Sequence, residues 1–405
     1  MTDRGRYRVL FVASHPVQYS APVFRHLAQH PQLDILVAYC TLKGSESHID
    51  PEFGVAVKWD VPLLDGYPWT HVPNGARHSR LGRFWGLYNP GLWGLLRKDH
   101  FDAVVLYTGY RCATFWITVA AALRTKTAVL FGTDAHQLQA RNGQRWKARL
   151  KAWLWGWLFR LADVVIVPSS GSAHLMHSLG IPAERVVLTP YVVDNDWWVE
   201  QAARADRSAV RAAWNIPTAA RVVLFCAKLQ PWKRPLDLLH AFAQADVPNA
   251  YLVYAGDGAL RDEVELLART LGIRDRVRML GFVNQSKLPE VYSAADLLVL
   301  PSDYEPFAVV VNEAMLCRCP VVVSDRVGAR YDLVKHGESG FVFPTGNVHA
   351  LAELLNAALQ DEPKLAKIRR AARHQLDCWS PRENVAGTVE AIERAVRLKE
   401  NSAYV

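Results

Sequence analysis

The sequence predicts an α/β protein with two Rossmann-like, doubly wound domains that face a central cleft. Short apolar runs rich in Val, Leu and Ile alternate with helical patterns through most of the 405 residues, which is typical of parallel sheets covered by helices. This series occurs twice, and a stretch at residues 193–220 interrupts it. Half of the residues are hydrophobic, but there is no run of about 18 apolar residues, so a globular chain without membrane spans is expected.

The first series predicts a domain over residues 1–195. Its apolar runs are expected to form strands at residues 8–13, 34–39, 103–107, 127–131, 164–168 and 186–188. The intervening patterns predict helices at residues 20–29, 91–98, 113–123, 141–160 and 171–179.

The second series predicts a domain over residues 196–378. Strands are expected at residues 221–227, 251–255, 277–280, 297–300 and 321–324, with helices at 235–245, 259–271, 286–294, 309–317 and 348–360. A final helix within residues 379–405 follows the second sheet, and we expect it to brace the two domains. Tandem sheets of this kind bind ligands beyond the carboxyl ends of their strands.

The six cysteines are scattered and form no CxxC pair. They indicate reduced thiols in a cytoplasmic enzyme, with neither a zinc site nor a disulfide framework. The N-terminus lacks the long apolar segment of a secretory signal, so secretion is not expected.

The net charge of +8 lies entirely within residues 1–195, which hold 21 Lys and Arg against 13 Asp and Glu. The densest part, residues 141–160, has no acid and carries six cations and four tryptophans: Arg141, Arg145, Lys147, Arg149, Lys151, Arg160, Trp146, Trp153, Trp155 and Trp157. Such a helix is typical of a segment that lies on an anionic membrane surface. The alternative is a buried helix with a solvated basic edge. No nucleic-acid partner is expected, because no nucleic-acid motif accompanies the charge.

The most informative segment follows the expected strand at 297–300. Glu305 lies in a turn and Glu313 lies eight residues later on the next helix. Between them, the backbone amides of Phe307, Ala308 and Val309 lie at a helix N-terminus, which attracts phosphate. Glu313 could then contact ribose hydroxyls and Glu305 could contact a sugar. The alternative is a surface acid followed by a helix cap.

Two further segments point to a bound diphosphate. Lys228 and Lys233 follow the first strand of the second domain, where two cations suit a diphosphate. The alternative is a solvated basic loop. Gly256 and Gly258 allow a tight turn between a strand and a helix, a weak signal by itself.

Taken in this order, the segments within residues 221–360 resemble the donor half of a family-four retaining glycosyltransferase of the GT-B fold. The E-x7-E element of the family corresponds to Glu305 and Glu313, and its Arg and Lys pair corresponds to Lys228 and Lys233. Its other motifs correspond to Gly256-Asp257-Gly258, Gly281-Phe282-Val283, Pro320 to Ser324, and Leu333 to Pro344. Three positions depart from the family pattern: Lys228 replaces an arginine, and Ala308 and Cys319 replace glycines.

The first domain resembles the family less strongly. One segment, from Ser14 to Tyr19, follows the first strand, and another, from Gly132 to His136, follows a later strand. The resemblance makes five residues candidates for acceptor binding or proton handling: His15, Gln18, Tyr19, Asp134 and His136. The alternative for each is a turn residue at a strand end.

The resemblance implies transfer of a sugar, with retention, from a UDP- or GDP-linked donor to a hydroxyl of a glycan, a lipid-linked glycan or a small molecule. It implies catalytic roles for Lys228, Lys233, Glu305 and His136, and a base contact at Phe282 and Val283. No cofactor or metal is expected, because Asp194-Asn195-Asp196 is interpreted as hinge and cap rather than as a metal-binding DxD motif. Two alternatives are a UDP-sugar epimerase of the same architecture and an inactive sugar-nucleotide-binding protein.

Overall fold

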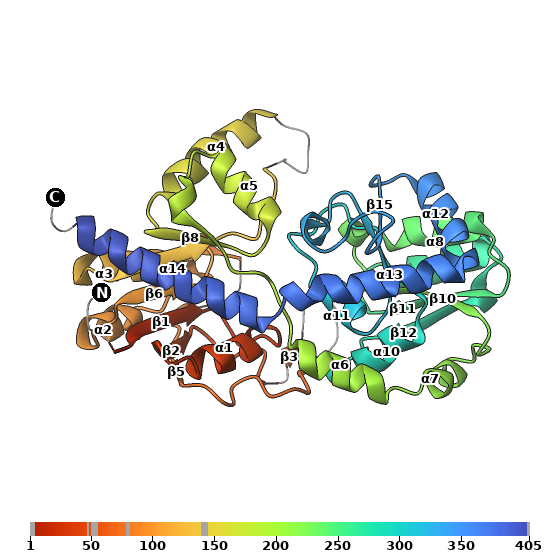
Figure 1. The fold of residues 1–405 in the computed structure, drawn as a ribbon, viewed down its shortest axis with the longest axis horizontal. Helices are drawn as coiled ribbons and strands as arrows, with labels where there is room; N and C mark the ends of the chain where they lie inside the picture. The colour runs from red at the N-terminus through yellow and green to blue at the C-terminus, as the bar shows by residue number, and fades with distance from the viewer. Residues whose placement is uncertain (1–4, 47, 50–55, 78–81, 139–144, 403–405) are drawn as a thin grey trace. The chain divides into compact units, whose positions relative to one another are not determined.

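The computed structural model describes residues 5–46, 48–49, 56–77, 82–138 and 145–402 (Figure 1). The chain divides into two compact units. Unit 1 comprises Met1–Glu46, Pro62–Tyr191 and Pro381–Val405, and unit 2 comprises Ser47–Val61 and Val192–Ser380.

Unit 1 is built on a seven-stranded sheet in which every neighbouring pair of strands is parallel. Across the sheet the order is β5 (Trp69–His71), β2 (Leu33–Tyr39), β1 (Tyr7–Ala13), β6 (Ala103–Leu106), β7 (Ala128–Gly132), β8 (Val164–Val167) and β9 (Val186–Leu188). The central strands are uninterrupted apolar runs because helices cover both of their faces.

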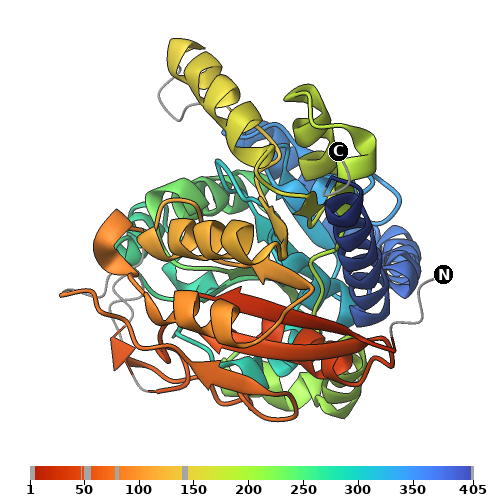
Figure 2. The same cartoon turned by 90° about the vertical axis from the view of Figure 1, so that its left-hand side faces the viewer.

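The two faces of this sheet are covered by different helices (Figure 2). One face shares a core with α2 (Gly91–Lys98), α3 (Ala113–Thr125), α4 (Arg145–Phe159) and α5 (Ser170–Ser178). Strand residues alternate between faces, so Phe11 points away from Leu10 and packs on Phe24 of α1 (Ser20–Ala28) at a ring-centroid distance of 5.5 Å. Helix α14 (Pro381–Ser402) packs against α1 and against β7 to β9.

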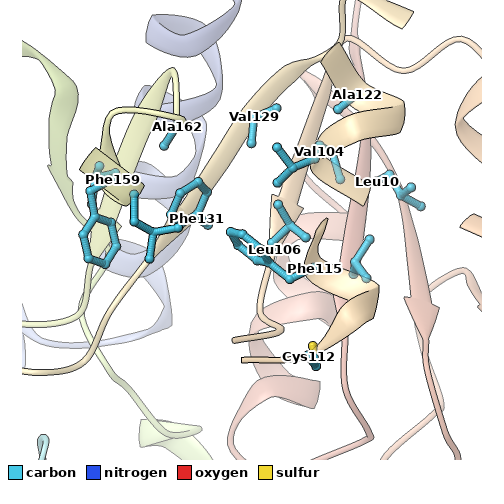
Figure 3. Packing of buried hydrophobic residues seen from close by; sticks show 14 of the residues in the cluster. Leu10, Val104, Leu106, Cys112, Phe115, Ala122, Val129, Phe131, Phe159 and Ala162 are labelled. Atoms are coloured by element: carbon cyan, nitrogen blue, oxygen red, sulfur yellow. The ribbon is translucent and has the colours of Figure 1, made fainter. Parts of the chain in front are cut away.

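Figure 3 shows the core between the sheet and α3, where side chains from β1, β6 and β7 interlock with aromatic rings. Phe115 of α3 meets Phe131 of β7 edge to face, with ring centroids 4.9 Å apart. Phe131 also packs on Phe159, the last residue of α4, which ties that helix to the sheet.

Unit 2 contains a six-stranded parallel sheet. The strand order is β12 (Val277–Gly281), β11 (Ala250–Ala255), β10 (Arg221–Cys226), β13 (Leu297–Leu300), β14 (Val321–Ser324) and β15 (Phe341–Phe343). Its helices are α6 (Asn195–Arg204), α7 (Arg207–Ala213), α8 (Pro235–Ala245), α9 (Arg261–Thr270), α10 (Leu288–Ala294), α11 (Val310–Leu316), α12 (Val348–Gln360) and α13 (Glu362–Gln375). A short antiparallel pair, β3 (His48–Ile49) and β4 (Ala56–Val57), belongs to the segment 47–61.

The predicted α/β class is confirmed, and each strand expected from the sequence is present. The structure adds β3, β4, β5, β15 and α13, and it places α6 and α7 in the stretch at 193–220. It also divides the expected helix at 286–294 into a 3-10 turn, η5 (Gln285–Lys287), and α10. The division into units differs from the expected boundaries, because residues 47–61 group with unit 2 and residues 381–405 group with unit 1. The bracing role expected for the last helix stays a prediction. Among the described helices, none has the length and apolarity needed to cross a bilayer.

Candidate functional site

The carboxyl edge of the unit 2 sheet carries an ion pair between two of the predicted residues. Lys233 ends the 3-10 turn η3 (Pro231–Lys233) after β10, and Glu305 lies in the loop after β13. The Lys233 Nζ donates to Glu305 Oε1, and Ser302 Oγ donates to the same oxygen at 2.9 Å. Only 20% of the lysine side chain and 10% of the glutamate side chain are exposed. The structure therefore brings the ammonium and the first carboxylate of E-x7-E together.

The Gly-Asp-Gly turn packs directly against the loop that carries Lys228. A Cβ added at Gly256 would lie 2.0 Å from the carbonyl oxygen of Ala227, and one at Gly258 would lie 2.7 Å from that of Leu229. Both glycines have φ near +150°, a conformation that side chains disfavour. The turn thus fixes the backbone on either side of Lys228, which is partly exposed.

The turn that precedes α11 has an unusual backbone. Phe307 is buried and stacks on Trp379 with ring centroids 6.0 Å apart and an interplanar angle of 4°. Ala308, the next residue, has φ of +84°. In the described part of the chain, the amides of Ala308 and Val309 donate to no protein acceptor. Two of the three amides expected from the sequence are therefore available to an anionic group, and their binding of a phosphate stays a prediction.

Glu313 lies inside unit 2 and not on its surface. The hydroxyl of Tyr292, on α10, donates to Glu313 Oε2 at 2.8 Å. Burial raises the pKa of the Glu313 carboxyl to about 7, and the hydrogen bond from Tyr292 opposes that rise. The second carboxylate of E-x7-E is therefore held in place by a buried tyrosine that sequence reasoning did not identify.

Cys226 links the two halves of this arrangement. Its thiol lies at the end of β10, 3.3 Å from the Tyr292 hydroxyl oxygen. Burial raises the pKa of the Cys226 thiol to about 12; the Glu313 carboxylate adds to the rise and the Lys233 ammonium opposes it. Because both charges act on one thiol, Lys233 and Glu313 share a neighbourhood at the carboxyl end of β10.

The predicted base-contact segment follows β12. Gly281 has φ of +70°, and its carbonyl oxygen accepts the amide of Gly256 at 2.8 Å, so this segment adjoins the Gly-Asp-Gly turn. The ring of Phe282 meets Trp59 edge to face at 6.2 Å, and Asn284 Nδ2 donates to the Lys58 carbonyl oxygen at 2.6 Å. Val283 is partly exposed. Trp59 and Lys58 come from the segment 47–61, which the sequence placed in the other domain.

In unit 1, Tyr19 and Asp134 lie close together, with Tyr191 as a third member. The rings of Tyr19 and Tyr191 meet edge to face at 6.1 Å. Burial raises the pKa values of the Asp134 carboxyl and of both tyrosines, and the Asp134 carboxylate adds to the rise at Tyr19 and Tyr191. Tyr191 follows β9, and no sequence motif distinguished it.

The other unit 1 candidates occupy loops that follow the strands. His15 follows β1, and its Nδ1 lies 2.9 Å from Ser14 Oγ. Gln18 is partly exposed, in the turn before α1. His136 is buried in the loop after β7, two residues beyond Asp134. Tyr19, Asp134 and Tyr191 therefore form a cluster, and the places of His15, Gln18 and His136 at an acceptor site stay predictions.

The Asp194 carboxylate caps a helix. It accepts the amide of Trp197 at 3.2 Å at the start of α6, and Asn195 Nδ2 donates to the carbonyl oxygen of Trp379 at 3.2 Å. The expected capping role is thus confirmed. Among the described residues, no group of three or more His, Cys, Asp or Glu side chains is arranged to hold a metal ion.

The chain matches two protein families. Residues 206–375 match glycosyl transferases group 1, and residues 57–192 match the glycosyl transferase 4-like domain. A D-inositol 3-phosphate glycosyltransferase of Streptomyces bingchenggensis is 31% identical over 371 residues, which is 86% of this chain and 75% of that protein. An alpha-D-kanosaminyltransferase of Streptomyces kanamyceticus is 28% identical over 51% of this chain and 53% of its own length.

Solved structures share the fold over the whole chain. The crystal structure of Anabaena Alr3699/HepE in complex with UDP and glucose has a TM-score of 0.72 and 22% identity, and the match covers 96% of this chain and all of that one. The first curated relatives are matched over only 36%, 53% and 44% of their own lengths. The relative from S. bingchenggensis is matched over most of both chains. With its two parallel sheets and its E-x7-E element, the chain belongs to the family-four (group 1) glycosyltransferases and has the GT-B fold.

Proposed function

We propose that this chain is a retaining, metal-independent glycosyltransferase that takes a hexose or a related sugar from a nucleotide-diphosphate donor. One observation carries the proposal: Lys233, Glu305 and Glu313 gather at the carboxyl ends of β10 and β13. This is the edge at which open parallel sheets bind their ligands. Family membership supports the same conclusion.

Each candidate site residue of unit 2 then has a proposed role in binding the donor. Lys228 and Lys233 bind the diphosphate, together with the available amides of Ala308 and Val309. The Glu313 carboxylate accepts hydrogen bonds from ribose hydroxyls, and Phe282 and Val283 border the base. Glu305 contacts the sugar. In the structure Glu305 neutralises Lys233, so the ammonium has a partner before the donor arrives.

The chemical step breaks the bond between the anomeric carbon and the β-phosphate oxygen. The acceptor hydroxyl attacks from the same face, and its proton passes to the departing phosphate oxygen, so no protein nucleophile is needed. Lys228 and Lys233 stabilise the negative charge that develops on the diphosphate. Loss of one such contact costs about 2.7–4 kcal/mol, a rate decrease of about 100- to 1000-fold.

The acceptor is proposed to bind unit 1 through Tyr19, Asp134 and residues near them, including His15, Gln18 and His136. The partial burial that raises the pKa of Asp134 suits a group that exchanges a proton with a hydroxyl. Relatives are named for D-inositol 3-phosphate and L-malate, so small hydroxylated acceptors are tested first, before glycans and lipid-linked acceptors.

The decisive experiment compares Lys233→Ala with Lys287→Ala, an exposed lysine of the same unit. A panel of UDP-, GDP- and dTDP-sugars is screened for thermal stabilisation, beginning with UDP-glucose, because structures of HepE contain UDP or UDP-glucose. We expect one donor to stabilise the wild type and Lys287→Ala, and Lys233→Ala to lose turnover while it keeps its helical circular dichroism. A folded Lys233→Ala protein with wild-type turnover would reject the proposal.

The two alternative functions predict different results in the same assays. An epimerase would convert the donor without an acceptor, and an inactive binding protein would be stabilised by a donor without transferring or hydrolysing it. Retention is checked by the anomeric coupling constant of the product. Turnover is expected to persist in EDTA; its collapse there would contradict the metal-independent mechanism.

A further inference from the structure

Helix α4 presents a broad apolar face to solvent. The exposed fractions are 62% for Trp146, 49% for Leu150, 70% for Trp153, 46% for Leu154 and 55% for Trp157. At 100° per residue, these five side chains fall within an arc of about 100°. Three exposed tryptophans therefore lie along one stripe of a single helix, an apolar face of a kind that soluble proteins rarely expose. The alternative of a buried helix is therefore wrong for this face.

The opposite face of α4 already anchors the helix to unit 1. Trp155, Leu158 and Phe159 are buried in the core of that unit, and Trp155 Nε1 donates to the Tyr110 hydroxyl oxygen at 3.0 Å. In both views α4 lies at the periphery of unit 1, beyond α3 and α5 (Figures 1 and 2). Burial in the core of unit 1 therefore explains why the inner face of α4 is apolar, but it does not explain why the outer face is apolar.

Cations border the exposed face on both sides. Lys147 and Arg149 flank it, and the chain contains no acid between Asp134 and Asp163. The Lys147 ammonium lies 5.5 Å from the ring centre of Trp146, an arrangement in which a lysine stem lies along an aromatic ring while its charge reaches outward. An apolar stripe bordered only by positive charge is complementary to a surface with an apolar interior and an anionic rim.

We propose that the outer face of α4 docks on an anionic lipid bilayer, with the tryptophans at the level of the headgroups and the cations on the lipid phosphates. Tryptophan prefers this interface because its ring is apolar and its N–H is polar. The 15 residues of α4 extend over roughly 22 Å, so the helix lies along the surface and does not cross it. This surface belongs to unit 1, whereas the proposed donor-binding residues belong to unit 2, and the inference does not depend on the proposed function.

The proposal is tested with the full chain and vesicles. Co-sedimentation is measured with vesicles of phosphatidylglycerol and phosphatidylcholine and with vesicles of phosphatidylcholine alone, each at low and high salt. We expect binding to the anionic vesicles that weakens at high salt. Lys147→Glu combined with Arg149→Glu is expected to lower the partition coefficient by about thirtyfold or more, since each cation near such a surface contributes about fivefold and the two losses multiply.

Matched variants distinguish vesicle binding by the outer face of α4 from nonspecific adsorption of the protein. Trp146→Ser combined with Trp153→Ser should lower binding at least about tenfold, whereas Leu266→Ser, at a 62% exposed leucine of α9, should leave it unchanged. Arg97→Glu with Lys98→Glu, at the exposed end of α2, serves as the control for charge. Helical circular dichroism and a cooperative thermal transition of each variant report whether unit 1, which carries α4, stays folded.

Three outcomes would overturn the proposal. The first is no binding to anionic vesicles at low salt by the folded wild type. The second is equal binding by the wild type and the α4 variants. The third is a dimer in sedimentation velocity that becomes monomeric in the double tryptophan variant while neither protein binds vesicles, which would assign the face to a second copy of the chain.

Discussion

Replacing Glu313 with glutamine tests whether the second carboxylate of E-x7-E is a strained, buried acid. In the folded protein the pKa of this carboxyl is raised from 4.5 to about 7, chiefly by burial. A difference of about 2.5 in pKa corresponds to about 3 kcal/mol. Because the folded state holds the proton more tightly, this stability is present below pH 4.5 and is lost as the pH rises through 7. At pH 8 the wild type therefore carries a penalty of about 3 kcal/mol that the neutral glutamine avoids.

The assay is thermal unfolding of the wild type and Glu313→Gln between pH 4.5 and 8. We expect the variant's advantage in Tm to grow with pH and to reach about 6 °C at pH 8, at about 2 °C or more per kcal/mol. Glu338→Gln, at an exposed acid of the same unit, should show no such trend. An advantage that stays constant with pH, or that shrinks as the pH rises, would refute the reasoning. The same variant should lose donor-induced stabilisation, since an amide replaces the proposed ribose-binding carboxylate.

The remaining predictions concern backbone and packing. Ala308→Gly should raise the free energy of unfolding by up to about 1 kcal/mol, measured in urea, because φ of +84° suits glycine. Asp296→Asn should lower it by about 3–5 kcal/mol, since the carboxylate accepts Arg211 Nη2 at 2.7 Å and both side chains are only 2% exposed. Glu200→Gln, which breaks an exposed pair, should change it by less than about 1 kcal/mol. Gly256→Ala should cost about 3 kcal/mol, since the added methyl collides with a backbone oxygen beside Lys228. It should also weaken donor binding, as measured by thermal shift.

The fold could be predicted from the sequence wherever a strand is an apolar run bounded by turns. The central strands satisfy this condition because helices cover them on both sides. β5 does not, because Trp69 and His71, two of its three residues, are exposed. Residues 47–61 belong to unit 2, which they contact through long-range pairs such as Lys58 and Asn284, 226 positions apart in the sequence. No local sequence pattern predicts such a contact.

The site could be predicted where chemistry sets the spacing of residues along the chain. The positions of Lys233, Glu305 and Glu313 could be predicted in this way, because each follows a strand that ends at the same sheet edge, whereas their binding roles stay predictions. Their supporting residues were not found. Tyr292 lies 21 positions from Glu313 and Tyr191 lies outside any motif, and a buried tyrosine looks like any other core residue until its hydroxyl partner is known.

Two departures from the family's glycines differ in their physical consequences. At the end of α11, Arg318 takes the left-handed conformation with φ of +58°, and the amide of Cys319 donates to the Ala314 carbonyl oxygen at 2.8 Å. The helix terminus thus places its positive φ on the residue before Cys319, so a side chain at position 319 causes no backbone strain. Ala308 has no such relief, because its own φ is positive. A residue that keeps backbone strain beside two available amides suits a turn whose shape matters more than its stability, which supports the diphosphate site proposed there.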